Sequence, residues 1–538
     1  MADKSCDKIL KGRKGNSGIP ELPVGQLLFQ ALKNAPKHSI AQVNGNTGAT
    51  ITFEQFYKES VKLAIALKKI GVQKGDVVSI VSENLINYWI PVLASAYLGA
   101  TVNPLNPIYS EGEMRRALDQ SRPTVIFCSE NAKDAVVGLY EQLIYVKRVI
   151  TFSETTPFTD SKTSLQFFNG VENDIDSFVP TKVSMDDTAF ILCSSGTTGF
   201  PKGVMLTHRS PRHYLACMSD PLFGTMSKDC VRLICLPLYH LIGCMQQVLS
   251  LYCQSLSVVL SKFKPDVFLR CIQEYRVNRM LVVPTLCIFL SNSPLVDKYD
   301  ISSLEEISWG GASMCKDIEA IVKKRLNLKQ VRQAYGTTEV GSACTIQVDL
   351  NKSGSAGCLC YDFMGKVCDP EKDTLLGPGK VGELRFKGPS VMKGYIRNPE
   401  ATAESFDADG FLKTGDAGYY DEDGYFYIVD RFKELIKYKA FQVPPAEIEA
   451  ILLTHPAVKE AAVVPKPDER AGEVPIAFVV KQDGKNVTEK ELVDLVAEKV
   501  SIQKRLYGGV IFTSELPKNN TGKILRRNLK EIAKTYSI

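Results

Sequence analysis

The first 430 residues alternate short apolar runs with helical patterns, and this alternation restricts the fold more than any other feature. Residues 76–81 and 123–128 are apolar runs of strand length, whereas residues 88–98 and 111–120 have helical periodicity. Strands that alternate with helices are typical of βαβ units, in which helices cover a parallel sheet. The pattern therefore predicts an α/β fold with parallel sheets.

Near Asp430 the pattern changes to a compact mixture of helices and strands. The Gly- and Asp-rich segment before it predicts a hairpin turn at residues 421–424. After it, the patterns predict a helix from Pro444 to the His455–Pro456 pair, strands at 460–465 and 476–480, and helices at 489–499 and 524–534.

The chain length requires more than one folding unit. At 538 residues the chain exceeds the size at which one hydrophobic core keeps growing. We expect a large N-terminal α/β domain, residues 1–432, and a small α+β C-terminal domain, residues 433–538. The family resemblance described below implies that the large domain has several subdomains and that the small domain is a mobile lid.

Composition and charge exclude several classes of protein. The net charge of +5 is small for this length and the basic residues form no stripe, which argues against a nucleic-acid partner. The 15 cysteines include no CxxC pair, so we expect reduced thiols rather than a zinc site. Residues 233–260 lack charged residues, but Pro237, His240 and Gly243 interrupt them, so we expect no integral membrane segment there. We interpret this stretch as a buried strand and helix beside an apolar cavity.

The segment SSGTTGFPKG, residues 194–203, is the chain's strongest chemical signal. Apolar strand-like runs flank it at 188–192 and 204–207, so it is a tight loop within a domain rather than a linker. Its glycines permit close backbone approach, its hydroxyls and amides can donate to phosphate oxygens, and Lys202 adds a positive charge. The loop is therefore predicted to hold a phosphate chain, although it lacks the spacing of a Walker A loop.

This loop, followed by Val204 and His208, resembles the phosphate-loop signature of the adenylate-forming superfamily. That group includes acyl-CoA synthetases, 4-coumarate–CoA ligases and insect luciferases. Four further motifs follow in the family's order: YGTTE at 335–339, TGD at 414–416, DRFKELIK at 430–437 and PKNNTGK at 517–523. The resemblance covers essentially the whole chain. It implies ATP-dependent activation of a carboxylic acid to acyl-AMP with pyrophosphate release, then transfer to CoA.

The resemblance also assigns the nucleotide contacts. It implies Mg²⁺ ligation by Glu339 and Thr198, donation from Thr338 to the α-phosphate, and acceptance of the ribose hydroxyls by Asp416 with help from Arg431. The phosphate loop would contribute Ser194, Ser195, Gly196, Thr197, Thr198, Gly199 and Lys202. The adenine pocket would be formed by Gly310, Gly311, Ala312, Gln333, Ala334, Tyr335 and Gly336.

Three further residues carry catalytic roles by the same resemblance. Lys523 would bridge the substrate carboxylate and the α-phosphate, and Lys437 would serve the second half-reaction after the small domain rotates about a hinge at Lys433. His240 would gate the acyl pocket. The alternative for Lys523 is a solvated surface lysine, and the alternative for His240 is a satisfied core histidine; His208 is predicted to be structural.

The chain departs from the family pattern at three positions. Ala440 replaces the glycine that lies against the pantetheine arm in CoA-using relatives, which places the thioester step in question. Ser219 and Ile242 replace an Arg and a Phe that beetle luciferases use for a flat aromatic acid. We therefore favour a fatty acyl-CoA synthetase. The alternatives are a luciferase that acts on another luciferin and an aromatic-acid ligase like 4-coumarate–CoA ligase.

The sequence contains few signals for cell location or oligomeric state. The C-terminal Tyr536-Ser537-Ile538 does not match the peroxisomal tripeptide that many relatives carry. We expect a cytoplasmic protein, with the peroxisome as the alternative, and a monomer or weak dimer.

Overall fold

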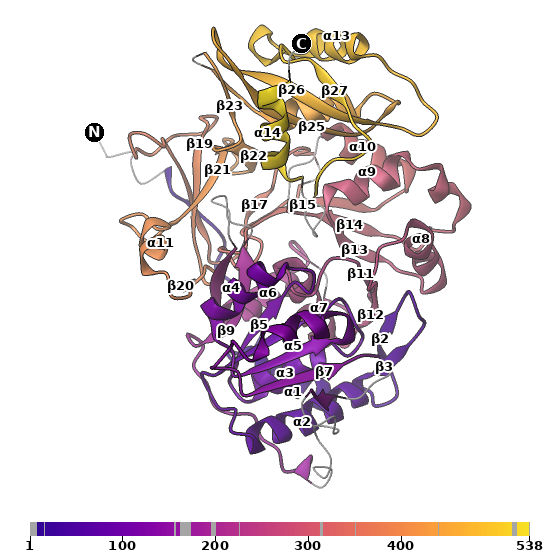
Figure 1. The fold of residues 1–538 in the computed structure, drawn as a ribbon, viewed down its shortest axis with the longest axis vertical. Coiled ribbons are helices and arrows are strands. Elements are labelled where there is room, and N and C mark those ends of the chain that lie inside the picture. The colour runs from indigo at the N-terminus through magenta and orange to yellow at the C-terminus, as the bar shows by residue number, and fades with distance from the viewer. Residues whose placement is uncertain are drawn as a thin grey trace.

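The computed structural model describes most of the chain and divides it into a large N-terminal and a small C-terminal domain of mixed α/β structure (Figure 1). The described residues are 8–15, 17–154, 158–161, 174–194, 201–224, 226–311, 316–349, 351–439, 441–518 and 524–536.

The first sheet has eight strands and a parallel centre. Its order is β20-β10-β9-β5-β4-β6-β7-β8, with β9, β5, β4, β6 and β7 parallel and β10 antiparallel to β9. The strands are β4 (Val77–Val81), β5 (Thr101–Leu105), β6 (Val125–Ser129), β7 (Arg148–Phe152), β8 (Thr159–Asp160), β9 (Thr188–Ser194), β10 (Lys202–Thr207) and β20 (Gly394–Tyr395). The accompanying helices are α1 (Val24–Lys33), α2 (Phe53–Lys69), α3 (Trp89–Tyr97), α4 (Glu111–Ser121), α5 (Lys133–Tyr140) and α6 (Arg209–Ser219). The predicted βαβ alternation is confirmed.

The second sheet has nine strands in the order β17-β16-β15-β14-β13-β11-β12-β2-β3, and its six inner strands are parallel. The strands are β2 (Ile40–Asn44), β3 (Thr50–Thr52), β11 (Val231–Ile234), β12 (Leu256–Val259), β13 (Arg279–Val282), β14 (Glu306–Trp309), β15 (Gln330–Tyr335), β16 (Thr345–Ile346) and β17 (Cys358–Leu359). Its helices are α7 (Leu241–Cys253), α8 (Pro265–Glu274), α9 (Pro284–Asn292) and α10 (Lys316–Arg325). The uncharged stretch forms the predicted strand and helix, β11 and α7, and also a second strand, β12, which was not predicted.

A third, antiparallel sheet completes the large domain. Its order is β1-β18-β19-β21-β22, and the predicted turn at 421–424 joins its last two strands. The strands are β1 (Leu10–Lys11), β18 (Met364–Cys368), β19 (Gly382–Lys387), β21 (Leu412–Tyr420) and β22 (Phe426–Arg431), with α11 (Pro399–Glu404) beside β20. The positive φ of Gly424, 80°, is the conformation that such a turn requires.

The small domain packs three helices on a five-stranded sheet, and it lies at one end of the molecule's long axis (Figure 1). The strands are β23 (Ile436–Tyr438), β24 (Phe441–Val443), β25 (Val458–Asp468), β26 (Gly472–Lys481) and β27 (Val510–Phe512). The helices are α12 (Pro445–Leu453), α13 (Glu489–Lys499) and α14 (Arg526–Thr535). The boundary at 432/433 and rotation about Lys433 stay predictions.

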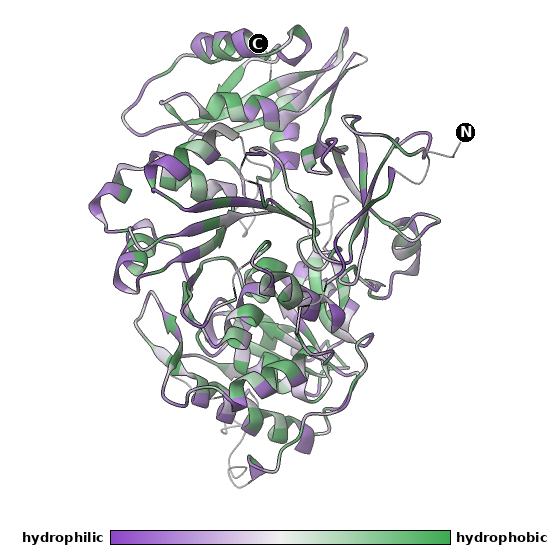
Figure 2. Cartoon of the chain, turned by 180° about the vertical axis from the view of Figure 1, so that it is seen from behind, coloured by the Kyte–Doolittle hydropathy of each residue, from purple (hydrophilic) through white to green (hydrophobic). Residues whose placement is uncertain are grey.

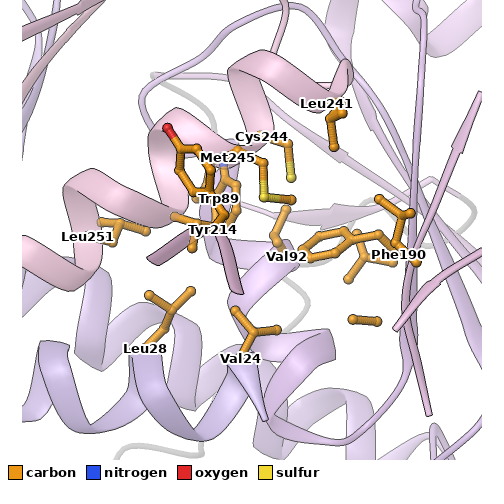
Figure 3. Packing of buried hydrophobic residues seen from close by; sticks show 14 of the residues in the cluster. Val24, Leu28, Trp89, Val92, Phe190, Tyr214, Leu241, Cys244, Met245 and Leu251 are labelled. Atoms are coloured by element: carbon orange, nitrogen blue, oxygen red, sulfur yellow. The ribbon is translucent and has the colours of Figure 1, made fainter. Parts of the chain in front are cut away.

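The largest core lies between the first sheet and its helices, and α7 also contributes to it. Figure 3 shows Leu241, Cys244, Met245 and Leu251 of α7 gathered with Trp89 and Val92 of α3 and Val24 and Leu28 of α1. Hydrophobic residues are concentrated in these interior elements, and hydrophilic ones on peripheral helices (Figure 2). The core therefore fixes the position of α7 relative to both sheets.

The described residues show neither a membrane-spanning helix nor a disulfide bond. Among the helices that the structure describes, none combines the length and apolar character needed to cross a bilayer. Every cysteine in the described ranges is a free thiol, and those residues contain no cluster of three or more His, Cys, Asp or Glu side chains that could hold a metal by itself.

A buried ion pair fastens the last helix to the small domain. Arg526 of α14 donates to Glu449 of α12, with one bond of 2.9 Å, and to the Val463 carbonyl at 2.7 Å. Arg526→Met would leave the Glu449 carboxylate buried without its cation, so we expect it to lower the free energy of unfolding of the small domain by about 3–5 kcal/mol. Chemical denaturation followed by circular dichroism measures this change.

Two variants control this prediction. Arg527→Met, at an exposed neighbouring position, is expected to leave the unfolding free energy within about 0.5 kcal/mol of the parent value. Glu449→Gln combined with Arg526→Met keeps an oxygen acceptor for the Val463 amide and removes the buried charge, so it should recover part of the loss. A single Arg526→Met variant as stable as the parent would contradict the prediction.

Candidate active site

The carboxyl ends of β13, β14 and β15 meet at one edge of the second sheet. The chain leaves these strands at Val283, Gly310 and Gly336, respectively. In open parallel α/β sheets, ligands bind in the crevice outside the carboxyl ends of the strands. A cavity of about 150 Å³ lies here, a volume comparable to one that admits a benzene ring.

The cavity lies between α7 and the face of the second sheet. Its apolar wall comes from Leu241, Ile242, Met245 and Leu249 of α7, with Tyr214, Met218 and Phe223 beside them. Gly310, Gly311, Ala334, Tyr335 and Gly336 line the edge where the strands end. Figure 3 shows Leu241 and Met245 on the same helix as the core residue Leu251, so one helix contributes both to the core and to the cavity.

Tyr335 and Asp416 form a buried polar pair next to the cavity, and the partly exposed Arg431 contacts Asp416. The Tyr335 hydroxyl donates to Asp416 Oδ2 at 2.6 Å, and Arg431 Nε lies 3.3 Å from Asp416 Oδ1. Asp416 and Arg431 stand directly opposite each other on β21 and β22, which explains their contact. Burial, followed by the charge of Asp416, raises the pKa of Tyr335 well above its ordinary value, so the hydroxyl remains a donor. Asp416 and Arg431 therefore form an ion pair, and their role towards the ribose stays a prediction.

The YGTTE segment follows β15 and brings Glu339 close to Tyr395 and Lys202. The Tyr395 hydroxyl donates to Glu339 Oε1 at 3.0 Å, and Lys202 Nζ lies 4.8 Å from the centre of the Tyr395 ring. Burial and the neighbouring Glu339 carboxylate raise the pKa of Tyr395, which keeps the hydroxyl protonated. Thr338 lies in the turn between β15 and Glu339 and is half-buried. Tyr395 was not among the predicted site residues, because no local pattern marks a residue 56 positions from its partner.

Glu339 is a chemically suitable ligand for Mg²⁺. Its carboxylate is half-buried and held by one hydrogen bond, and hydroxyl oxygens lie nearby in sequence at Thr337 and Thr338. Mg²⁺ prefers oxygen ligands and is usually held by one or two carboxylates together with substrate phosphates, rather than by a cage of protein side chains. A single acidic residue at this place therefore fits the ion. Thr198, the other predicted ligand, lies outside the described residues.

The phosphate loop connects two paired strands. Ser194 and Lys202 are register partners at the ends of β9 and β10, so the predicted position between strands is confirmed. Ser194 is 6% exposed, and its Oγ has no hydrogen-bond partner among the described residues, as is expected of a hydroxyl that awaits a ligand. The remaining predicted loop residues, Ser195, Gly196, Thr197, Thr198 and Gly199, lie outside the described residues.

Close packing of the backbone explains the small residues of the predicted adenine pocket. A Cβ at Gly336 would lie 2.2 Å from the Ser342 carbonyl oxygen, and Gly311 has a φ of 82°. Gln333 exchanges hydrogen bonds with Gln347, since its amide donates to the Gln347 side chain at 3.1 Å and its carbonyl accepts from the Gln347 amide at 2.8 Å. Ala334 is half-buried beside the cavity. Ala312 lies outside the described residues.

His240 stands at the amino end of α7. Its Nδ1 accepts from the Ile242 amide at 3.4 Å, and the next two residues, Leu241 and Ile242, line the cavity. The histidine is therefore a helix cap at the cavity wall, which is compatible with the predicted gating role.

His208 is buried at the start of α6. Burial lowers the pKa of its imidazole to about 4, despite the opposing influence of Asp187. The ring is therefore neutral at pH 7, as suits the structural role predicted for it.

The small domain supplies the two predicted lysines. Lys437 lies on β23 with an exposed side chain, and its amide donates to Glu473 at 2.8 Å. Lys523 lies outside the described residues. Near the predicted hinge, Lys530 of α14 forms an ion pair with Glu434 at 3.1 Å and donates to the Lys433 carbonyl at 3.4 Å. These contacts join α14 to the segment that connects the domains.

Four charged residues that were not predicted to belong to the site also line the cavity: Arg232, Arg279, Glu306 and Arg332. Each belongs to a different strand of the second sheet. Their meeting depends on the sheet's register, which no single stretch of sequence shows.

Comparison with known proteins identifies the family. The model for AMP-binding enzymes matches residues 28–396, and the model for the C-terminal domain of AMP-binding enzymes matches residues 447–523. The chain belongs to the AMP-binding enzyme family. It is therefore an adenylate-forming enzyme, as the motifs predicted.

Relatives of this AMP-binding enzyme match nearly its whole length. It is 39% identical to luciferin 4-monooxygenase of Photinus pyralis, with 98% of both chains covered. It is 38% identical to probable 4-coumarate–CoA ligase 1 of Dictyostelium discoideum, with 95% of this chain and 96% of that one covered. Among solved structures, ATP-bound MatB from Rhodopseudomonas palustris superimposes with a TM-score of 0.83 at 27% identity, over 95% of this chain and 99% of that one.

His208 makes the stability of the AMP-binding enzyme depend on pH. Its folded pKa of about 4 lies below the ordinary 6.5, so the unfolded chain binds the extra proton between these two values. Stability is therefore complete above pH 6.5 and falls as the pH decreases towards 4, by up to about 3 kcal/mol. Urea unfolding at a series of pH values measures this dependence.

His208→Gln removes the titrating group and should flatten the curve between pH 6.5 and 4 relative to the parent. The exposed His38→Gln variant is the matched control and should keep the parent slope. Equal slopes for the parent and His208→Gln would contradict the assignment.

Proposed function

We propose that this enzyme activates a carboxylic acid, favouring a fatty acid, with ATP to form acyl-AMP and pyrophosphate, and then transfers the acyl group to CoA. One observation carries the proposal: the apolar cavity opens at Gly310, Gly311 and Gly336, beside the Tyr335–Asp416–Arg431 group. An acid in the cavity and a nucleotide held by Asp416 would meet at this edge with the carboxylate next to the α-phosphate.

The proposed first step needs charge stabilisation rather than a general base. A carboxylate oxygen of the acid attacks the α-phosphorus of ATP. The bond between that phosphorus and the oxygen that bridges it to the β-phosphate breaks, and pyrophosphate leaves with the electron pair. The carboxylate is already ionised at pH 7. Negative charge accumulates on the phosphate oxygens, and fixed donors and cations stabilise it. Mg²⁺, held through Glu339, would neutralise part of that charge.

Each of several residues of this chain would contact a different part of the nucleotide or the acid in that step. Asp416, oriented by the Tyr335 hydroxyl and Arg431, accepts the ribose hydroxyls. Ser194 and Lys202, at the ends of β9 and β10, hold the phosphate chain with the intervening loop. Thr338 donates to the α-phosphate, and Lys523 bridges it to the carboxylate. In the second step, the CoA sulfur attacks the acyl carbon, AMP leaves, and the thiol proton passes to solvent.

The aliphatic character of the cavity favours a fatty acid over a flat aromatic acid. Ile242 lines the cavity where beetle luciferases carry a Phe. The hydroxyl of Ser219, where those enzymes carry an Arg, is directed to the backbone, donating to the Ala216 carbonyl at 2.7 Å. Both positions therefore support an aliphatic substrate.

Light emission from an adenylated luciferin is the second candidate function. The 39% identity to a luciferin 4-monooxygenase over 98% of the chain favours it.

The compartment and the oligomeric state stay predictions, namely cytoplasm and a monomer or weak dimer.

Product analysis tests these alternatives. The enzyme is incubated with Mg-ATP and a panel of saturated and aromatic acids, with and without CoA, and the products are identified by mass spectrometry. We expect acyl-CoA from fatty acids. Acyl-adenylate that never passes to CoA would contradict the synthetase proposal and would indicate that Ala440 blocks the thioester step. Light from firefly luciferin with Mg-ATP would support the second candidate.

The two predicted lysines should separate the half-reactions. Lys523→Met should lower acid-dependent ATP–pyrophosphate exchange by about a hundredfold or more, because it removes a charge that stabilises the transition state. Lys437→Met should leave that exchange near the parent rate and slow thioester formation from preformed acyl-AMP. Lys439→Met, a neighbouring lysine, is the control and should affect neither step. Equal effects of Lys523→Met and Lys437→Met on both steps would contradict the assignment.

A further inference from the structure

Four charged residues, here called the row, lie on the face of the second sheet that lines the cavity: Arg232, Arg279, Glu306 and Arg332. Arg232 of β11 is the register partner of Arg279 of β13, which in turn is the partner of Glu306 of β14. Arg332 lies two residues beyond Gln330, the β15 partner of Glu306, and so points to the same face. The alternate residues Ile307 and Val331 belong to the apolar core on the opposite face.

The row lies at the end of the cavity that is remote from the nucleotide residues. Glu306 begins β14, whereas Gly310 follows its last residue. Four residues at about 3.3 Å each separate them by roughly 13 Å along the strand. The apolar side chains of α7 line the space between. An acid whose carboxylate lies at Gly310 would therefore point its far end towards the row.

The row carries more positive than negative charge. Glu306 lies between two of the arginines, paired with Arg279 through one oxygen and 3.7 Å from Arg332 Nε through the other. It is the one carboxylate among the described residues that line the cavity, against three guanidinium groups. Glu305 approaches Arg279 to 3.9 Å, but it also accepts from Lys329 at 2.7 Å and lies at the sheet edge.

Two of the three guanidinium groups are held by neighbouring oxygen atoms, and the third has a buried donor without a partner among the described residues. Arg332, whose side chain is 7% exposed, donates to the Leu222 carbonyl at 2.7 Å and to the side chain of Gln330. Arg232 donates to the Ser255 hydroxyl at 2.7 Å. Arg279 Nε is buried without a hydrogen-bond partner among the described residues. A buried donor of this kind costs free energy unless a ligand satisfies it.

We propose that the cavity selects carboxylic acids that carry a second anionic or hydrogen-bond-accepting group at the far end, with a dicarboxylic acid as the best match. A terminal carboxylate can accept paired hydrogen bonds from a guanidinium group and offsets the excess positive charge. A plain fatty acid would place a methyl group against these cations and leave Arg279 Nε unsatisfied. This inference rests on the proposed function and specifies its substrate class.

Matched acids of equal length test the proposal. Acid-dependent pyrophosphate release is measured with decanoate, ω-hydroxydecanoate and sebacate, and then with the shorter pair octanoate and suberate. We expect kcat/KM to be highest for the diacid, intermediate for the hydroxy acid and lowest for the plain acid. A preference for the plain acid at both lengths would overturn the inference and leave the proposed function intact. Failure of every acid to release pyrophosphate would overturn the proposed function, and the inference with it.

Two substitutions should move this preference in opposite directions. Arg279→Met removes a cation and should lower the kcat/KM ratio of sebacate to decanoate by about tenfold to a hundredfold. Glu306→Gln removes the only described carboxylate of the cavity wall and should raise that ratio. The exposed Arg115→Met variant on α4 is the matched control and should leave the ratio unchanged.

The opposite signs distinguish substrate recognition from a purely structural ion pair. If Arg279 and Glu306 served only to support the sheet, either substitution would lower the thermal midpoint and leave the ratio unchanged. Thermal unfolding is therefore measured for each variant together with the ratio. A ratio that moves in the same direction in both variants, or in neither, would overturn the proposal.

Discussion

The hydrogen bond from Tyr335 to Asp416 joins two sheets at the place where the nucleotide and the acid would meet. Tyr335 ends β15 of the second sheet, and Asp416 lies on β21 of the third. Because both groups are buried, the loss of either partner would leave the other unsatisfied in a low-dielectric environment. The cavity edge, the YGTTE segment and the Asp416–Arg431 pair all depend on this alignment.

Helix α7 contributes side chains both to the largest hydrophobic core and to the wall of the cavity. Leu241, Cys244 and Met245 pack in the largest hydrophobic cluster, and Leu241 and Met245 also line the cavity. A close-packed core transmits changes of side-chain volume. The shape of the cavity is therefore coupled to packing against α1 and α3, so substitutions on those helices should alter substrate choice as well as stability.

The cavity combines an apolar wall with a charged end. An apolar surface alone discriminates weakly between acids that differ by a methylene group, whereas buried donors reject ligands that leave them unpaired. Arg279 Nε is such a donor, Arg232 and Arg332 add positive charge, and Glu306 sets how much of that charge remains. The balance of these four side chains thus determines which far end of an acid the enzyme accepts.

The sequence by itself determined the family, the α/β alternation and the ends of the phosphate loop, because these are encoded in contiguous patterns. The helix predicted at 489–499 is α13 with the same bounds. Only the tertiary structure placed Tyr395 against Glu339 and gathered Arg232, Arg279, Glu306 and Arg332 on one wall. Those contacts arise from register between strands distant in the chain, and local sequence carries no record of which strands will be neighbours.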